Sequence, residues 1–262
     1  MTNNGRDTFR TEPVVLITGA TGNLGSKLAR ELVKNSQKSI LVDQMPHPNL
    51  NVRIANLSVP GNWMQLFAGV DIVIHLAGTS KVSSSPDTLK SQNVDCTANV
   101  LKACRMHNVS RIVFASSLRV MDGYREFGRR ITEDLPPKPS GDFGRSKLHC
   151  EKLLAAYPDV ICLRLGWSPR YNIRENVLRA PKRLREVWLS DSDFLQAIEL
   201  SISAENRGFT VFNLTSDVEN SRYPLSRARK HLGYKPRDGV NKTQIVISKL
   251  SGTLFSKAAW SR

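Results

Sequence analysis

Cysteine is scarce in this sequence, and its arrangement suits neither a disulfide framework nor a metal site. The four cysteines form no C-x-x-C pair and have no histidine at metal-ligand spacing; they are Cys96, Cys104, Cys150 and Cys162. Cys104 and Cys150 fall in apolar helical patterns, so we predict reduced, buried packing residues. The five histidines are scattered along the chain, and we predict no metal site.

Long apolar runs are also missing. No run approaches the ~20 residues that a membrane-spanning helix needs. The N-terminal segment MTNNGRDTFRTEP is polar and lacks the apolar core of a secretory signal. The sequence therefore predicts a cytoplasmic protein without a membrane partner. Its 262 residues, 40% hydrophobic and 23% charged, are typical of one large globular domain or of a domain with a small appendage.

Acidic residues are few: 23 Asp and Glu stand against 38 Lys and Arg, which gives a net charge of +15. Basic residues concentrate in 164–185, with seven Lys or Arg and one acid, and in 222–237, with six and none. Such surfaces can bind nucleic acid, an anionic membrane or an anionic small molecule. We interpret 222–237 as a solvated surface and 164–185 as functional, and the lack of interleaved aromatic residues disfavours nucleic acid.

Hydrophobic periodicity predicts an α/β fold of the Rossmann type, a doubly wound parallel sheet. Short apolar strands are expected at 14–18, 39–43, 52–57, 71–76, 111–117 and 160–166, with helices between them. Beyond Gly166, prolines divide the chain into short elements, with one clear helix at 190–204 that Ser190 is expected to cap. We expect a polar tail at 1–12, a nucleotide-binding domain at 13–166, and a smaller substrate-side region at 167–262 that is interleaved with the main fold.

The segment TGATGNLG places Gly19, Gly22 and Gly25 between the first strand and the first helix. Glycines at this turn let the backbone approach a pyrophosphate, which then lies at the positive end of the helix. Asp43 ends the second strand, 18 residues beyond Gly25, where an acid can accept hydrogen bonds from both ribose hydroxyls and would repel a 2′-phosphate. The pattern predicts a dinucleotide site that prefers NAD to NADP.

With these motifs the chain resembles the extended short-chain dehydrogenase/reductase superfamily, the NAD-dependent epimerases and dehydratases. The resemblance rests on TGATGNLG, on HLAG at 75–78, on Asn93 at the start of the next helix and on ASSLRV at 115–120. Within the superfamily it is nearest to uronate dehydrogenases, through RIVFASS (111–117), WLSDSDFLQAIE (188–199) and HLGYKPRD (231–238).

Carried over position by position, the resemblance implies a set of cofactor contacts: Asn23, Leu24, Asp43, Asn56, Leu57, Leu76, Ala77, Gly78 and Asn93. Asn56 stands where the family usually has an acid, and its amide can still accept a bond from the adenine amino group. Ser117 matches the serine that contacts the reacting hydroxyl or carbonyl. Lys147 matches the lysine that holds the nicotinamide ribose.

The family's proton-transferring tyrosine is replaced by Phe143, which lies 26 residues after Ser117 and four before Lys147. A phenylalanine ring cannot move a proton. Two interpretations stay open: an active enzyme that uses Ser117, a water held by Lys147, or Tyr124 in its place, and an NAD-binding sensor or scaffold that has lost catalysis. We favour an enzyme. A nucleotide-sugar epimerase or dehydratase is a further alternative, while an accidental match is hard to reconcile with the spacing.

The substrate is expected to be an anionic sugar or sugar acid. The resemblance places a substrate-binding arginine at Arg183, with Arg185 beside it, and a guanidinium can hold a carboxylate by two hydrogen bonds. The preceding loop adds Arg170, Arg174, Arg179 and Lys182, which we expect at the mouth of the substrate site. Ser80 is a further candidate sugar contact. A homodimer is an expected assembly, because two-fold dimers are common among soluble enzymes.

Overall fold

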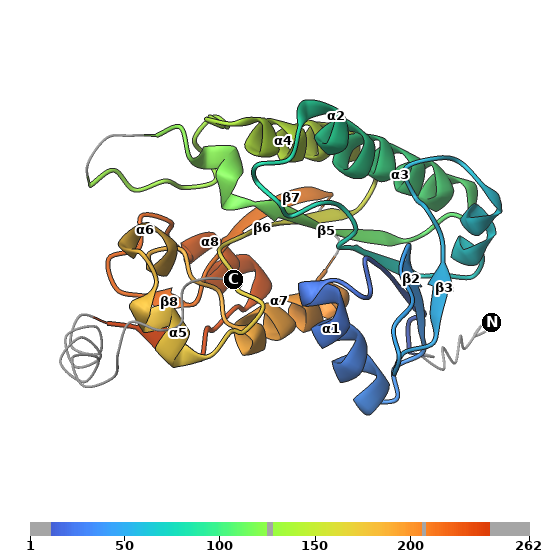
Figure 1. Cartoon of the computed structure of the whole chain (residues 1–262), viewed down its shortest axis with the longest axis horizontal. Coiled ribbons are helices and arrows are strands. Elements are labelled where there is room, and N and C mark those ends of the chain that lie inside the picture. Colours follow the sequence, from blue (N-terminus) through green and yellow to red (C-terminus); the bar gives the residue numbers. More distant parts are fainter. Residues whose placement is uncertain (1–11, 125–127, 206–207, 242–262) are drawn as a thin grey trace, which may run out of the picture.

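The computed structural model describes residues 12–124, 128–205 and 208–241, and its centre is a seven-stranded parallel sheet (Figure 1). The strand order is β3-β2-β1-β4-β5-β6-β7. The strands are β1 (Val15–Thr18), β2 (Ser39–Asp43), β3 (Val52–Ile54), β4 (Ile72–His75), β5 (Arg111–Ser117), β6 (Val160–Leu165) and β7 (Phe209–Leu214). The order reverses between β1 and β4, and ligands of open parallel sheets bind beyond the strand ends at such a point.

Helices cover both faces of the sheet, as parallel strands require. On one face lie η1 (Asn62–Phe67), α2 (Pro86–Leu89), the π-helical turn η2 (Lys90–Asp95), α3 (Cys96–Met106) and α4 (Asp142–Leu154); α2, α3 and α4 are at the top of Figure 1. The core beneath them joins Leu16 and Val73 of the strands to helix residues such as Val100 and Leu154. All four cysteines are unpaired and buried, as predicted, and lie in this layer.

The opposite face is covered by α1 (Asn23–Lys34), α7 (Asp191–Ser203) and α8 (Ser226–Leu232). Val15 and Ile17 point to this layer, whereas Leu16 between them points to the other. This alternation is the period of two expected of a strand, with both faces buried. Helix α1 adds Leu28 and Leu32, which repeat every four residues as the sequence indicated.

The predicted strands and helices are confirmed with small shifts at their ends. Ser190 accepts a hydrogen bond from the Asp193 N–H at 3.1 Å and so caps α7 as predicted. The sequence pattern missed β7, which pairs in parallel with β6 over six residues and completes the sheet. Because β7 and α7 belong to the central layers, residues beyond 166 form a large share of the main fold as well as a substrate-side region.

That region contains α5 (Arg174–Arg179), α6 (Lys182–Arg185) and the two-stranded sheet of β8 (Asp217–Val218) and β9 (Gly239–Val240). It lies beyond the carboxyl ends of β5 and β6 (Figure 1). The helices within the described ranges are all too short or too polar to cross a membrane.

Candidate active site

Two adjoining cavities lie beyond the carboxyl ends of the strands, with volumes of about 790 and 260 Å³. Gly19, Gly22, Leu76 and Gly78 line both cavities, so the two form one continuous cleft across the reversal point. Asp43, Asn56, Leu57 and Ala77 line the smaller part. Ser117, Phe143, Lys147 and Arg183 line the larger part. The cleft therefore has a nucleotide end and a reaction end.

The glycine turn between β1 and α1 has no room for side chains. Gly19 has a φ of +75°, and a Cβ there would lie 2.6 Å from the Ala77 backbone nitrogen. A Cβ on Gly25 would lie 1.9 Å from the Gly19 carbonyl oxygen. No side chain caps the start of α1, and Asn23 Oδ1 is buried without a hydrogen-bond partner among the described residues. The N–H groups of the glycine turn are bonded within the protein, whereas no bond is found in the described residues for those of Asn23, Leu24 and Gly25 in the first turn of α1, which fits a bound pyrophosphate there.

Asp43 is held at the nucleotide end by two backbone donors. Its Oδ2 accepts from the Thr21 N–H at 2.9 Å, and its Oδ1 accepts from the Met45 N–H at 3.2 Å. These bonds fix the carboxylate beside the glycine turn. Asn56 is exposed, and its Oδ1 accepts from the Ser58 N–H at 3.0 Å, which leaves the amide NH₂ available to a ligand.

Asn93 lies behind the cleft wall. It is buried in η2. Its side-chain oxygen packs so closely on Gly78 that a Cβ added to this glycine would lie 2.6 Å from the oxygen. Its amide donates to Ser146 Oγ at 3.0 Å, and that hydroxyl donates to the Phe143 carbonyl at 2.8 Å. Asn93 therefore joins the wall of the nucleotide end to the first turn of α4. It lines neither part of the cleft, and the cofactor contact expected of it from the sequence stays a prediction.

Phe143 and Lys147 lie one helical turn apart on α4 and face the end of β5. Both are buried, with 7% of each residue exposed, and both line the larger part of the cleft. Lys147 Nζ donates to the Ala115 carbonyl at 2.9 Å, two residues before Ser117 on the same strand. Ser117 Oγ accepts from the Arg119 N–H at 3.2 Å. The structure thus brings together Ser117, Lys147 and Phe143, the three residues that match the catalytic positions of the family.

The surroundings of Lys147 act on its pKa in both directions, and the lowering effect of burial is the larger. Burial lowers the pKa of its amine, and Glu151, its nearest buried carboxylate on α4, is engaged by Arg164 at 2.7 Å. The facing thiols stay protonated near neutral pH because burial raises the pKa of each; that of Cys96 rises to about 12. The charge of Glu151 acts to raise the pKa of Lys147, but burial outweighs it, so this lysine exchanges protons at a lower pH than a surface lysine does.

Tyr124 lines the larger part of the cleft, but its hydroxyl is engaged elsewhere. The hydroxyl donates to the Pro136 carbonyl at 2.8 Å, and the centre of the ring lies 4.9 Å from Arg129 Cζ and 5.2 Å from Lys138 Nζ. These contacts place its oxygen on a backbone carbonyl, away from the Ser117–Lys147 pair. Tyr124 as a replacement proton carrier stays an untested prediction.

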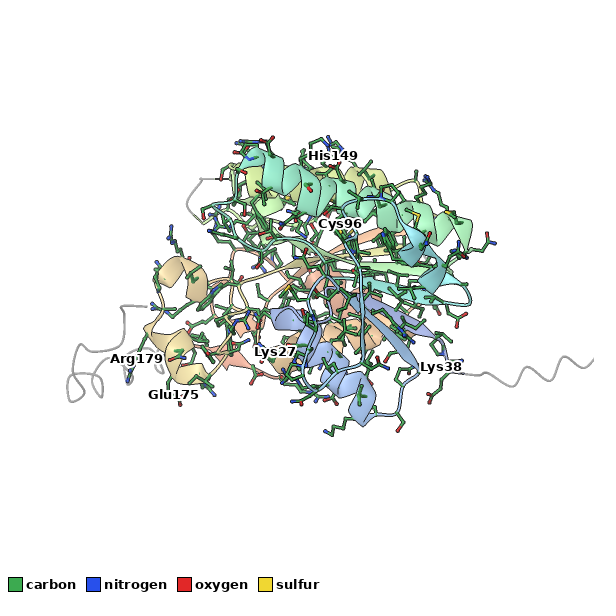
Figure 2. All side chains as sticks on the ribbon, turned by 45° about the vertical axis from the view of Figure 1, so that its right-hand side comes forward. Lys27, Lys38, Cys96, His149, Glu175 and Arg179 are labelled. Carbon is green, nitrogen blue, oxygen red and sulfur yellow. The ribbon has the colours of Figure 1, made fainter. Side chains whose placement is uncertain are left out.

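Of the basic residues in 164–185, only Arg183 lines the described cleft, together with Ser80 on another wall. Arg185 donates to the carbonyls of Leu178 and Ala180, and Arg164 forms the buried pair with Glu151. Arg170, Arg174, Arg179 and Lys182 do not line it, contrary to the expected basic mouth. Figure 2 shows Glu175 and Arg179 at the outer edge of α5, while Lys27 of α1 faces this segment and pairs with Asp191 at 2.8 Å.

Sequence reasoning missed four side chains on the wall of the reaction end: Arg119, Trp167, Arg222 and Tyr223. Arg119 lies two residues after Ser117, so the family motif pointed to its neighbourhood. Arg222 and Tyr223 reach the cleft through the tertiary fold. In the sequence, the basic character of 222–237 was the only sign that this segment could face an anionic ligand. Its interpretation as plain solvated surface is wrong for Arg222. No cluster of three potential metal ligands is present within residues 12–124, 128–205 and 208–241.

This combination of a parallel sheet, a glycine turn, an acid after β2 and a serine–lysine pair at the end of β5 defines a dinucleotide-dependent oxidoreductase of the extended short-chain dehydrogenase type. Residues 15–165 match the NAD dependent epimerase/dehydratase family, and the chain belongs to that family.

Relatives named as sugar and sugar-acid dehydrogenases cover most of the chain. The uronate dehydrogenase of Pseudomonas putida is 30% identical, with 86% of this chain and 84% of the relative covered. The L-arabinose 1-dehydrogenase (NAD(P)(+)) of Haloferax volcanii is 27% identical, with 86% and 96% covered. A point mutant of the uronate dehydrogenase from Agrobacterium tumefaciens, complexed with NAD, has a TM-score of 0.76 at 26% identity, covering 94% and 90%. The cofactor of this chain is NAD, and the expected likeness to uronate dehydrogenases is confirmed.

Asp43 is expected to set the preference for NAD. Replacing it with alanine removes acceptors for the ribose hydroxyls, and hydrogen bonds to a charged group contribute about 1.5–3 kcal/mol each. NAD binding should therefore weaken by about tenfold or more. Calorimetry on the purified chain measures this, and Glu175→Ala on the outer edge of α5 is the control. Equal affinity of the wild type for NAD and NADP would contradict the role of Asp43.

Proposed function

We propose that this protein is a dehydrogenase that oxidises a hydroxyl group of an anionic sugar or sugar acid with NAD, by a proton path that does not use the family's tyrosine. The observation that carries the proposal is the position of Arg183. Its exposed side chain lies on the same cleft as Ser117 and Lys147, and no hydrogen bond or ion pair is formed by it among the described residues. An unengaged guanidinium at the reaction end favours a substrate carboxylate.

Each residue at the reaction end has a role in this proposal. Ser117 contacts the hydroxyl to be oxidised, and Ser80 contacts the sugar. Lys147 orients the nicotinamide ribose, and the proton of the hydroxyl leaves through Ser117 or a water that Lys147 holds. Bound NAD supplies the hydride acceptor. Phe143 keeps this wall of the cleft apolar, and the missing phenol makes proton transfer the weak step, since a positioned base contributes about 10²–10⁴-fold in rate.

Arg183→Ala tests the substrate class. With D-glucuronate or D-galacturonate and NAD, we expect the variant to raise KM by about tenfold or more, since it removes charge-assisted hydrogen bonds. Turnover of a neutral aldose such as D-glucose should be unaffected by the change. The matched control is Arg179→Ala, an exposed arginine on α5 that does not line the cleft. Equal use of neutral and acidic sugars by the wild type would contradict the proposal.

Phe143 itself favours a second candidate, an NAD-binding sensor or scaffold without turnover. The fold and cofactor end would be retained in such a protein, while the lost oxygen would leave no proton carrier at this position. NAD binding without NADH formation from any sugar acid, in the wild type and in Phe143→Tyr alike, would support it.

A further inference from the structure

A buried ion pair lies directly behind the reaction end of the cleft and has no part in the proposed chemistry. Arg164 of β6 donates from Nε and Nη2 to the two carboxylate oxygens of Glu151 on α4, at 2.9 and 2.7 Å. Each residue is only 3% exposed, and neither lines the cleft. Because the cost of burying two charges offsets much of their attraction, such a pair adds little stability over apolar side chains of the same size. Its contacts, more than its strength, therefore indicate what it does.

The pair joins three elements at the carboxyl end of the sheet. Ser116 of β5 is the strand partner of Arg164, and its Oγ donates to Glu151 Oε1 at 2.5 Å. Arg164 Nη1 lies 3.2 Å from Met121 Sδ, at the end of the 3-10 turn η3 (Leu118–Met121). Glu151 thus ties α4 to β5, and Arg164 contacts the turn that follows this strand.

Lys147 is tied to the same strand one helical turn earlier. It lies four residues before Glu151 on α4, so the two side chains are on one face of the helix. Lys147 Nζ donates to the Ala115 carbonyl at 2.9 Å, next to the bond between Glu151 and Ser116. Two attachments one turn apart fix the position of Lys147 relative to Ser117.

The ion pair also acts on Lys147 through its charges. Burial lowers the pKa of the lysine, and the negative charge of Glu151 acts in the opposite direction. Arg164 is bound to the same carboxylate and compensates part of its charge. Removing the charge of Glu151 therefore favours the neutral amine, whereas removing that of Arg164 favours the ammonium.

The other titratable groups that face Lys147 are uncharged near neutral pH. Burial raises the pKa of three facing thiols, those of Cys96, Cys150 and Cys162. Burial lowers the pKa of the His75 ring to about 3. The negative charge that acts on Lys147 near neutral pH therefore comes from Glu151.

We propose that Glu151 and Arg164 are positioning residues, which hold Lys147 and the end of β5 in the arrangement that binds the nicotinamide ribose of NAD. This inference rests on the role of Lys147 at that ribose, which belongs to the proposed function. Phe143 offers no hydrogen bond on this wall of the cleft, so the polar contacts there fall to Ser117 and Lys147. A small displacement of the lysine is then not compensated by a neighbouring phenol.

Calorimetry on the full chain tests the proposal, with NAD and ADP as paired probes. ADP fills only the nucleotide end, whereas NAD also places a ribose at the reaction end. Glu151→Gln should weaken NAD binding by about tenfold or more, the range for a hydrogen bond to a charged group, and leave ADP binding within twofold of wild type. Lys147→Met should give the same pattern.

The matched control is Asp159→Asn. It breaks the other buried ion pair of these two strands, in which Arg111 at the start of β5 lies 2.8 Å from Asp159 just before β6. This variant should lower the stability of the fold and leave the affinities for NAD and ADP within twofold of wild type.

The pH dependence of NAD binding separates positioning from general damage to the fold. NAD affinity should fall with rising pH as Lys147 loses its proton, because a neutral amine is a weaker donor than an ammonium. Glu151→Gln should move this fall to lower pH and Arg164→Met to higher pH, each by about one unit. A purely structural role would weaken NAD binding in both variants without shifts of opposite sign.

Equal loss of NAD and ADP affinity in Glu151→Gln, or pH shifts of the same sign in the two variants, would overturn the proposal. Unchanged NAD affinity in Lys147→Met would overturn it together with the proposed role of the lysine. If Lys147→Met alone weakens NAD binding, the positioning role fails and the role of the lysine stands.

If a single variant unfolds, Glu151→Gln combined with Arg164→Met decides, because the double variant leaves no unpaired buried charge. It should lose affinity for NAD and not for ADP, and unchanged affinity for both would contradict the proposal. These measurements follow binding, so they stand even if no turnover is found and the proposed dehydrogenase activity fails.

Discussion

Phe143→Tyr is expected to raise NAD-dependent turnover of a sugar acid by about 10²–10⁴-fold, the contribution of a positioned general base. The substitution adds one phenol oxygen to a ring that already lines the cleft, one turn before Lys147 on α4. A phenol has an unperturbed pKa of about 10, and an adjacent ammonium lowers it. The oxygen would therefore face the end of β5, where Ser117 lies.

The assay is NADH formation from D-glucuronate at saturating NAD. Phe143→Leu is the matched control, since it changes the packing without adding a proton carrier and should give no gain. Slower turnover by Phe143→Tyr than by an active wild type would show that the chemistry has been rebuilt around another base. Tyr124→Phe would then be the next variant, because Tyr124 also lines the cleft.

Acid is expected to destabilise the fold strongly through His75. This side chain is fully buried at the end of β4, and burial together with the charge of Lys147 lowers its pKa from 6.5 to about 3. Between those two values the unfolded chain binds the extra proton, so the free energy of unfolding falls as pH is lowered from 6.5. The stability is fully present above pH 6.5, and at ~1.4 kcal/mol per pKa unit the loss approaches roughly 4–5 kcal/mol near pH 3.

Urea unfolding at a series of pH values measures this slope. His75→Gln should flatten it, because the amide cannot be protonated and can still bond Thr18 Oγ1 and Thr97 Oγ1, which lie 2.7 and 3.0 Å from the ring nitrogens. His149, on α4 and labelled in Figure 2, provides the control His149→Gln. An unchanged acid slope in His75→Gln would show that other groups carry the acid sensitivity.

Much of the nucleotide end could be predicted from sequence because its signals are local. Three signals act over only a few residues. The strands alternate with a period of two, and α1 repeats leucine every four residues at Leu24, Leu28 and Leu32. The third signal is glycine at Gly19 and Gly25, where a Cβ would collide with the backbone. The role of Asp43 could be predicted because it ends the strand that follows this glycine turn and helix. Phe143 and Lys147 could be aligned because one helical turn fixes their spacing.

The reaction end was decided by tertiary structure. Whether an arginine binds a ligand depends on what surrounds it, and the sequence does not record that: Arg164 is buried against Glu151, Arg185 is bound to carbonyls, and only Arg183 of this stretch reaches the described cleft. The Tyr124 hydroxyl donates to the Pro136 carbonyl, a contact that the sequence does not record. Arg119, just beyond β5, and Tyr223, in the segment after β7 and β8, line one cleft because the carboxyl ends of β5 and β7 open toward the same side of the sheet. Sequence by itself thus determined the fold and its cofactor, through contacts between near neighbours, whereas the charges that select a substrate were assigned by contacts between residues far apart in the chain.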